Sequence, residues 1–145
     1  MIYLDPSVVV TLITPEQHTF AAEAWLQEQL SGTVTVSEWV LTEVASALAI
    51  KQRTRVLDDL GRARVQRIYE RLVSQLEILP VRPAAFREAA RMCARWESGL
   101  RGGDALHIAI AADHHMDLCT RDQVQAAAAQ HIGLRTVVLP VAVTP

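Results

Sequence analysis

The sequence predicts an α/β fold in which helices cover both faces of a central parallel sheet, so that the chain forms a three-layer sandwich. Short apolar or β-branched segments alternate with longer segments whose apolar residues recur at helical spacing, as in strands joined by crossover helices. The chain has 145 residues, of which 50% are hydrophobic, enough for one core. It contains no internal repeat and no low-complexity linker, so we expect a single domain spanning residues 1–145.

Five segments are predicted to be strands. Each is short and apolar or β-branched, and most are bounded by residues that favour turns. The first ends at the acidic turn Asp5-Pro6-Ser7, and the fourth ends at Arg121-Asp122. The predicted strands are residues 2–4, 33–36, 78–81, 118–120 and 136–139. Because helices separate them, we expect right-handed crossovers and a parallel arrangement.

Seven further segments are predicted to be helices. Ser7 is expected to cap the first and Ser37 the third, because a serine side chain can accept a hydrogen bond from the backbone at a helix start. Gly102-Gly103-Asp104 leads into the sixth, which is strongly apolar. The predicted helices are residues 8–13, 15–30, 38–50, 56–76, 83–96, 105–114 and 123–131.

The composition limits which partners and compartments the chain can have. Its net charge is -2, so a nucleic acid would have to be held by a local basic patch rather than by the field of the whole domain. The cysteines form no CxxC pair and the histidines no HExxH pattern, which argues against a zinc site. We find no signal peptide and no apolar run of about 18 residues, and therefore expect a cytoplasmic protein that does not enter a membrane.

Four acidic residues are placed where such a sheet would gather them. Asp5 directly follows the first strand, Asp122 follows the fourth, and Asp104 opens the helix that leads into the fourth. Ligands of open α/β sheets bind outside the carboxyl ends of the strands, where the winding direction reverses. Glu43 interrupts the apolar stripe of the third helix, where a carboxylate is costly unless something pairs with it. We therefore expect these four side chains to meet in one catalytic site.

A cluster of four carboxylates favours a divalent metal ion. Without a cation the charges repel one another and raise the pKa values of the acids. Mg²⁺ suits such a site because it prefers about six oxygen ligands and keeps waters while it binds substrate phosphates, and Mn²⁺ is its natural substitute. Such an ion activates water for in-line attack on a phosphodiester. The pattern therefore favours metal-dependent hydrolysis without a protein nucleophile.

Each acid also has a simpler structural explanation. Asp104 and Asp122 can cap the helices that follow them. Asp5, which precedes a proline, can form an Asx turn, and Glu43 can be a partly exposed residue of an amphipathic helix. All four explanations would have to hold together for the site to vanish, and we therefore favour the catalytic interpretation.

Four sequence motifs resemble those of the PIN domain, and specifically of the VapC toxins of bacterial type II toxin–antitoxin systems. Residues 3–7 are similar to the family's opening strand with its D-x-S turn, and residues 42–48 resemble its second motif. Residues 103–111 resemble its aspartate motif, and Thr120-Arg121-Asp122 resembles its T-x-D motif. The resemblance spans essentially the whole chain. One departure is that no aromatic residue follows Asp122 at the next two or three positions.

The resemblance implies a Mg²⁺-dependent endoribonuclease that acts as the toxin of a toxin–antitoxin pair. It implies a sheet with strand order 3-2-1-4-5, a homodimer, and inhibition by a cognate antitoxin protein whose tail occupies the active-site groove. It also implies that the four acids bind the metal or its water, with Asp5, Asp104 and Asp122 as the ligands. By the same resemblance, Ser7 and Thr120 donate hydrogen bonds to these ligands.

Three other residues lie close to the acids in sequence. Arg101 and Arg121 can contact RNA phosphates through charge-assisted hydrogen bonds, or can simply offset the local negative charge. His107 lies one turn beyond Asp104. We expect His107 to pack within an apolar helix, and we leave it outside the predicted catalytic set.

Two other functions remain as alternatives. One is a receiver or phosphatase-like domain that takes phosphate on Asp5. It is disfavoured because Ser7 replaces the second aspartate of a D-x-D start and because the only lysine, Lys51, is poorly placed to grip a phosphoryl group. The other is a PIN fold without catalysis that binds RNA or protein. The presence of all four acids disfavours it.

Overall fold

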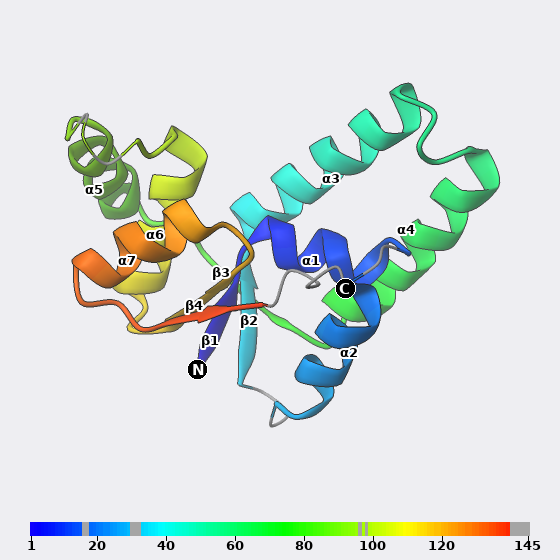
Figure 1. The fold of residues 1–145 in the computed structure, drawn as a ribbon, viewed down its shortest axis with the longest axis horizontal. Coiled ribbons are helices and arrows are strands. Elements are labelled where there is room, and N and C mark those ends of the chain that lie inside the picture. The colour runs from blue at the N-terminus through cyan, green and yellow to red at the C-terminus, as the bar shows by residue number, and fades with distance from the viewer. Residues whose placement is uncertain (16–17, 30–32, 96, 98, 140–145) are drawn as a thin grey trace, which may run out of the picture.

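The fold is organised around a parallel sheet. The computed structural model describes residues 1–15, 18–29, 33–95, 97 and 99–139. Within them the sheet has five strands in the order β3-β2-β1-β4-β5, and every neighbouring pair runs parallel (Figure 1). The strands are β1 (Ile2–Leu4), β2 (Val34–Ser37), β3 (Glu77–Leu79), β4 (Asp117–Thr120) and β5 (Thr136–Val138). The predicted fold class and strand order are therefore confirmed.

Seven α-helices connect the strands within the same residues. They are α1 (Pro6–Ile13), α2 (Thr19–Gln27), α3 (Glu38–Arg53), α4 (Asp59–Val73), α5 (Pro83–Cys93), α6 (Gly102–Asp113) and α7 (Gln123–His131). Helices α1 to α4 lie on one side of the sheet and α5 to α7 on the other (Figure 1). The winding direction reverses between β1 and β4, where a ligand site is expected. None of these helices is both long and apolar enough to cross a membrane.

Two of the helix starts that differ from the prediction lie at the site. Helix α1 begins at Pro6 and is capped by Asp5, whose side chain accepts from the Val8 N–H, so the prediction that Ser7 caps it was wrong. Proline at the first helical position has a suitable φ and no N–H to satisfy, which favours this start. Helix α6 begins at Gly102, so Asp104 lies in its first turn and does not cap it.

Other elements are shorter than predicted. The second helix covers Thr19–Gln27 and the fifth ends at Cys93; the remaining predicted ends near residues 16, 30 and 96 lie outside the described part of the chain. Helix α4 covers Asp59–Val73, because Asp58 caps it through the Gly61 N–H. The third strand is Glu77–Leu79 and ends before Pro80, which has no N–H for strand pairing.

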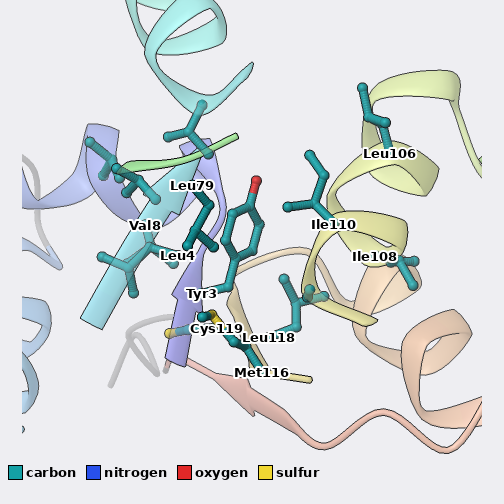
Figure 2. Close-up of a cluster of buried hydrophobic side chains, with 14 of the residues drawn as sticks. Tyr3, Leu4, Val8, Leu79, Leu106, Ile108, Ile110, Met116, Leu118 and Cys119 are labelled. Atoms are coloured by element: carbon teal, nitrogen blue, oxygen red, sulfur yellow. The ribbon is translucent and has the colours of Figure 1, made fainter. Parts of the chain in front are cut away.

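The core extends on both faces of β1. Tyr3 and Leu4 are fully buried, and apolar side chains from α1, α6 and the neighbouring strands surround them (Figure 2). Helix α6 is buried around its whole circumference from Ala105 to Ala111, as its apolar sequence predicts. The polar residue within that buried stretch is His107. A buried histidine needs hydrogen-bond partners, which it finds at the site described below.

Candidate active site

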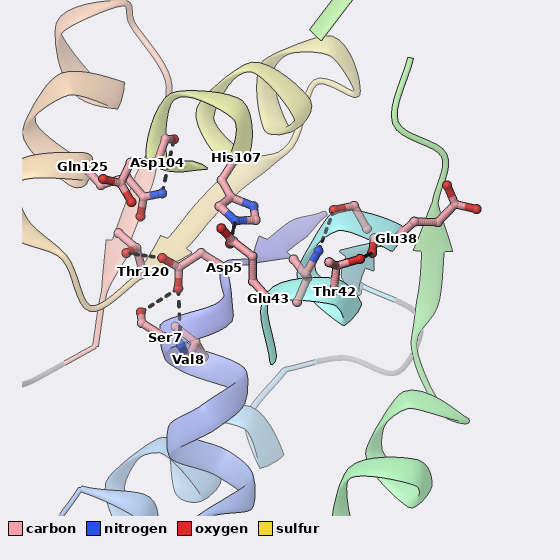
Figure 3. A network of polar contacts seen from close by, with 12 residues as sticks. Asp5, Ser7, Val8, Glu38, Thr42, Glu43, Asp104, His107, Thr120 and Gln125 are labelled. Carbon is pink, nitrogen blue, oxygen red and sulfur yellow. Dashed lines mark hydrogen bonds and ion pairs between the residues drawn. The ribbon is translucent and has the colours of Figure 1, made fainter. Parts of the chain in front are cut away.

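The carboxyl ends of β1 and β4 bring the two halves of the site together. These strands pair in parallel register, with Leu4 opposite Cys119, and the Asp5 N–H donates to the Cys119 carbonyl at 3.0 Å. Asp5 therefore leaves the sheet at the same edge as the turn that carries Asp122. The neighbouring strand β2 leads into α3, which carries Glu43, and Asp104 lies in the first turn of α6. Figure 3 shows the side chains of Asp5, Glu43 and Asp104 around this edge.

Asp5 is the most buried of the four acids, with 5% of its surface exposed. Its Oδ1 accepts from the Ser7 hydroxyl at 2.6 Å and from the Val8 N–H at 3.2 Å, and its Oδ2 accepts from the Thr120 hydroxyl at 2.8 Å (Figure 3). Burial raises the pKa of Asp5, while the three hydrogen bonds act in the opposite direction. An ionised Asp5 is therefore oriented by donors but still lacks sufficient compensating charge.

The turns after β1 and β4 are held together by two hydroxyl groups. Thr120 donates to Asp5 and accepts from the Asp122 N–H at 3.0 Å. Ser7 donates to Asp5 and accepts from the Arg121 N–H at 3.1 Å. Each hydroxyl thus bridges the two turns, and this arrangement orients the Asp5 carboxylate from both sides.

Asp104 and Asp122 lie at the starts of two helices, Asp104 in the first turn of α6 and Asp122 at the N-cap of α7. Asp122 is the N-cap of α7 and accepts from the backbone N–H groups of Val124 and Gln125 at 2.7 and 3.0 Å, so the capping explanation is met for this residue. The Gln125 amide donates to the Asp104 carbonyl at 3.3 Å. Burial raises the pKa of Asp104, and the charges of Asp122 and Glu43 raise it further. The three carboxylates therefore influence one another electrostatically.

Glu43 has a partner that the sequence did not predict. Its Oε2 lies 2.6 Å from Nε2 of His107 (Figure 3), and its side chain remains 32% exposed. His107 is buried, as expected, but it also contacts an acid of the site. A signal was present in the sequence: a glutamate within an apolar helical stripe needs a partner, and His107 lies one turn beyond Asp104.

The two arginines near the acids are placed differently. Arg101 precedes α6 and is exposed. Arg121 is partly buried, and its guanidinium group donates to the Thr11 hydroxyl at 2.5 Å, which fastens the turn after β4 to α1. Of the two, Arg101 is therefore the more accessible to a ligand.

The four acids match a hard divalent cation in their chemistry. They offer only carboxylate oxygens, which Mg²⁺ and Mn²⁺ prefer. In the described part of the chain, no three His, Cys, Asp or Glu side chains are already arranged as a metal-binding group. The Asp5 and Asp122 carboxylates serve as helix caps and that of Glu43 contacts His107. Burial raises the pKa values of Asp5 and Asp104, so a cation bound beside them would stabilise their ionised forms.

Comparisons with known proteins agree with the fold. The PIN domain family model matches residues 2–131. The structure is similar to FitAcB from Neisseria gonorrhoeae, with 20% identity, a TM-score of 0.74, and coverage of 94% of this chain and 96% of that chain. It is also similar to VapBC2 from Rickettsia felis bound to a promoter DNA fragment, with 18% identity, a TM-score of 0.72, and coverage of 97% and 100%.

A third similar structure is VapC20 of Mycobacterium tuberculosis, described as a sarcin-ricin loop cleaving toxin. It shares 18% identity with a TM-score of 0.68, and the match covers 88% of this chain and 95% of that chain. At such identities the likeness establishes the fold. The search of curated protein sequences finds no match.

Proposed function

Because the chain belongs to the PIN domain family, we propose that it is a metal-dependent endoribonuclease and the toxin of a toxin–antitoxin pair. The observation that carries this proposal is the gathering of acids from separate segments at one sheet edge. Asp5 and Asp122 follow adjacent strands, while Asp104 and Glu43 approach from α6 and α3. The structural neighbours include toxins and toxin–antitoxin complexes, which supports the assignment of a toxin role.

Asp5, Asp104 and Asp122 would hold the metal ion, with Mg²⁺ as the proposed cofactor and Mn²⁺ as a substitute. When bound, such an ion supplies positive charge to the phosphate oxygens and lowers the pKa of its water. Ser7 and Thr120 keep the Asp5 carboxylate turned toward the site through their hydroxyl groups. These hydrogen bonds orient the Asp5 carboxylate before RNA arrives, so that metal binding does not have to order this side chain.

Glu43 is proposed to accept a hydrogen bond, and then a proton, from the attacking water. His107 already engages Oε2, so Oε1 is the oxygen assigned to this contact. In the reaction, the water oxygen bonds to phosphorus while the bond from phosphorus to the leaving ribose oxygen breaks. The proton taken from water is released to solvent or to the leaving oxygen, and the products are a phosphate monoester and a hydroxyl group.

RNA must approach an acidic site on a chain of net charge -2. We propose that Arg101 and Arg121 contact its phosphates near the acids, with Arg101 as the more exposed of the two. We also propose a cytoplasmic location, a homodimer, and a cognate antitoxin protein as inhibitor. Solved complexes such as the toxin–antitoxin complex from Klebsiella pneumoniae support the last of these by similarity of fold.

The proposal is tested by RNA cleavage with metal removal and replacement. The purified chain should cleave RNA with Mg²⁺ or Mn²⁺, stop with EDTA, and resume when either ion is restored. Asp104→Asn should remove this activity while the protein still unfolds cooperatively on heating. If the folded wild-type chain binds RNA but leaves it intact with every divalent ion, it is a binding module and the nuclease proposal is wrong.

A further inference from the structure

The carboxylate of Glu43 is held on two sides. On one side, Oε2 lies 2.6 Å from Nε2 of His107, a residue that is only 1% exposed. On the other side, Oε1 faces the backbone of Gly103, where a Cβ atom would lie only 2.8 Å away. Glu43 belongs to α3, and both neighbours belong to α6 (Figure 3). Two helices far apart in sequence therefore define the place of one carboxylate.

A series of buried hydrogen bonds connects His107 to Ser37 through Tyr3. The Tyr3 hydroxyl lies 2.7 Å from Nδ1 of His107 and 2.7 Å from Oγ of Ser37. Burial raises the pKa of Tyr3, so its hydroxyl keeps its proton. Ser37 is the N-cap of α3 and accepts from the Val40 N–H. These hydrogen bonds thus connect the start of α3, through the rings of Tyr3 and His107, to Glu43 further along the same helix.

The direction of the hydrogen bond between His107 and Glu43 follows from the chemistry of the imidazole and the carboxylate. An ionised carboxylate can only accept, so Nε2 of His107 must carry a proton and donate it to Glu43. Nδ1 is then paired with the Tyr3 hydroxyl, which can donate to Nδ1 or accept from it. Nε2–H remains the donor to Glu43 in both arrangements. The ring of His107 cannot turn without losing contacts at both nitrogens, so Tyr3 fixes its orientation.

Gly103 provides the space that Glu43 occupies. A Cβ atom 2.8 Å from Oε1 is closer than a normal contact, so a side chain at this position would displace the carboxylate. The displaced atom is the end of a flexible side chain, and the fold can accommodate its movement. Gly103 lies within α6 and is not among the glycines with positive φ, so its value here is space rather than conformational freedom. The preceding Gly102 has nothing within 4 Å of its would-be Cβ.

We propose that His107 and Gly103 are positioning residues that hold the Glu43 carboxylate in place for reaction, with Tyr3 orienting the His107 ring. The catalytic part of this inference rests on the ribonuclease activity proposed above. A purely structural role, in which Glu43 only satisfies a buried histidine, predicts that substitutions here change stability alone. A positioning role predicts slower turnover in a protein that remains folded.

The first experiment compares Gly103→Ala with Gly102→Ala, the same change on neighbouring residues of one helical turn. Gly102→Ala should melt at or above the wild-type temperature, because alanine favours a helix over glycine. Gly103→Ala should gain the same helix preference but lose part of it, because moving Glu43 weakens its contact with the buried His107, and it should remain folded. Gly103→Ala should lower kcat about 10- to 100-fold, as expected when a residue that supports a catalytic group is lost. Its KM for RNA should stay within about twofold of wild type, because binding of RNA is unchanged. Gly102→Ala should keep the wild-type kcat, and equal kcat values in the two variants would overturn the proposal.

The second readout requires neither RNA nor metal. In the metal-free protein, the Nε2 proton of His107 should give a downfield NMR signal that exchanges slowly, because its hydrogen bond is short and the ring is buried. The signal should move in Gly103→Ala and remain in place in Gly102→Ala. An unchanged signal in Gly103→Ala means that Glu43 has not moved, which contradicts the inference. A wild-type chain that fails to cleave RNA refutes the proposed function, while this measurement still tests the positioning.

The third experiment asks whether a donor alone can replace His107. The amide nitrogen of His107→Gln can reach the place of Nε2 and donate to Glu43, whereas His107→Leu has no donor. We expect the glutamine variant to keep at least about a tenth of the wild-type kcat and the leucine variant to lose about 100-fold. Equal losses in the two folded variants would remove His107 from the positioning role. If the leucine variant does not fold, the glycine pair still decides the question.

Discussion

Replacing Asp5 by asparagine should separate the chemistry of the site from its contribution to folding. The Asp5 carboxylate accepts from Ser7, Val8 and Thr120. Asparagine keeps one acceptor oxygen for the first two donors, but its NH₂ group cannot accept from Thr120, and one charge-assisted hydrogen bond is worth about 1.5–3 kcal/mol. Burial raises the pKa of Asp5, which means that its charge is unfavourable there. Removing the charge therefore offsets part of the lost hydrogen-bond energy. We expect the free energy of unfolding to fall by at most about 2 kcal/mol.

The loss of activity should be much larger than the loss of stability suggests. A bound metal ion stabilises the charge of the transition state by several kcal/mol, and about 1.4 kcal/mol changes a rate tenfold. Losing one ligand carboxylate and about 3 kcal/mol of this stabilisation lowers kcat/KM about 100-fold. Asp5→Asn should therefore fold and cleave RNA at no more than about one hundredth of the wild-type rate.

The assay combines initial rates of RNA cleavage in Mn²⁺ with thermal unfolding in the presence and absence of the ion. Asp117→Asn is the matched control, because Asp117 begins β4 at the opposite edge of the sheet and pairs with the exposed Arg135 at 3.4 Å. That control should retain both activity and stability, since exposed ion pairs contribute little. If Asp5→Asn cleaves RNA within tenfold of the wild-type rate, Asp5 does not bind the metal ion.

Three further predictions concern neighbouring residues. Burial and the charge of Asp122 raise the pKa of Asp104, so metal-free stability should fall as pH rises from the ordinary aspartate range through the raised pKa; Asp104→Asn should therefore melt higher than wild type at neutral pH but not in acid. Thr120→Val removes the donor to Asp5 and the acceptor for the Asp122 N–H, and should cost about 1–3 kcal/mol in denaturant unfolding; no change would show that these bonds do not matter. Arg101→Gln should weaken RNA binding. The slope of the logarithm of the binding constant against the logarithm of salt concentration should become shallower by about 1, and an unchanged slope would exclude a phosphate contact.

The sheet could be predicted from sequence because each strand has a local sequence pattern. Short apolar or β-branched segments alternate with helical periodicity, and only a parallel arrangement fits that order of elements. Helix starts were harder to predict. Both Asp5 and Ser7 are good capping residues, and the choice between them depends on Pro6. The start of α6 at Gly102 was missed because glycines are weak helix formers, and tertiary burial of the following residues outweighs that preference.

The outline of the site was also predictable, but its fine geometry was not. The rule that ligands lie beyond the carboxyl ends of strands placed Asp5 and Asp122 at one edge. The contact between His107 and Glu43 joins residues in two different helices. The sequence indicates that Glu43 needs a partner, but it does not indicate which side chain supplies one. The space that Gly103 leaves for a carboxylate from α3 is likewise visible only in the structure.

The hydrogen bond between Thr120 and Asp5 makes the site depend on a late part of the chain. β1 is made first, yet it lies in the middle of the sheet and pairs with β4, which is made near the end. A growing chain that has not yet extended past Thr120 lacks one strand beside Asp5 and one of its three hydrogen-bond donors. Because the site needs both strands, the ribonuclease proposed above would gain its activity only after residues 117–120 have been made and have folded against β1.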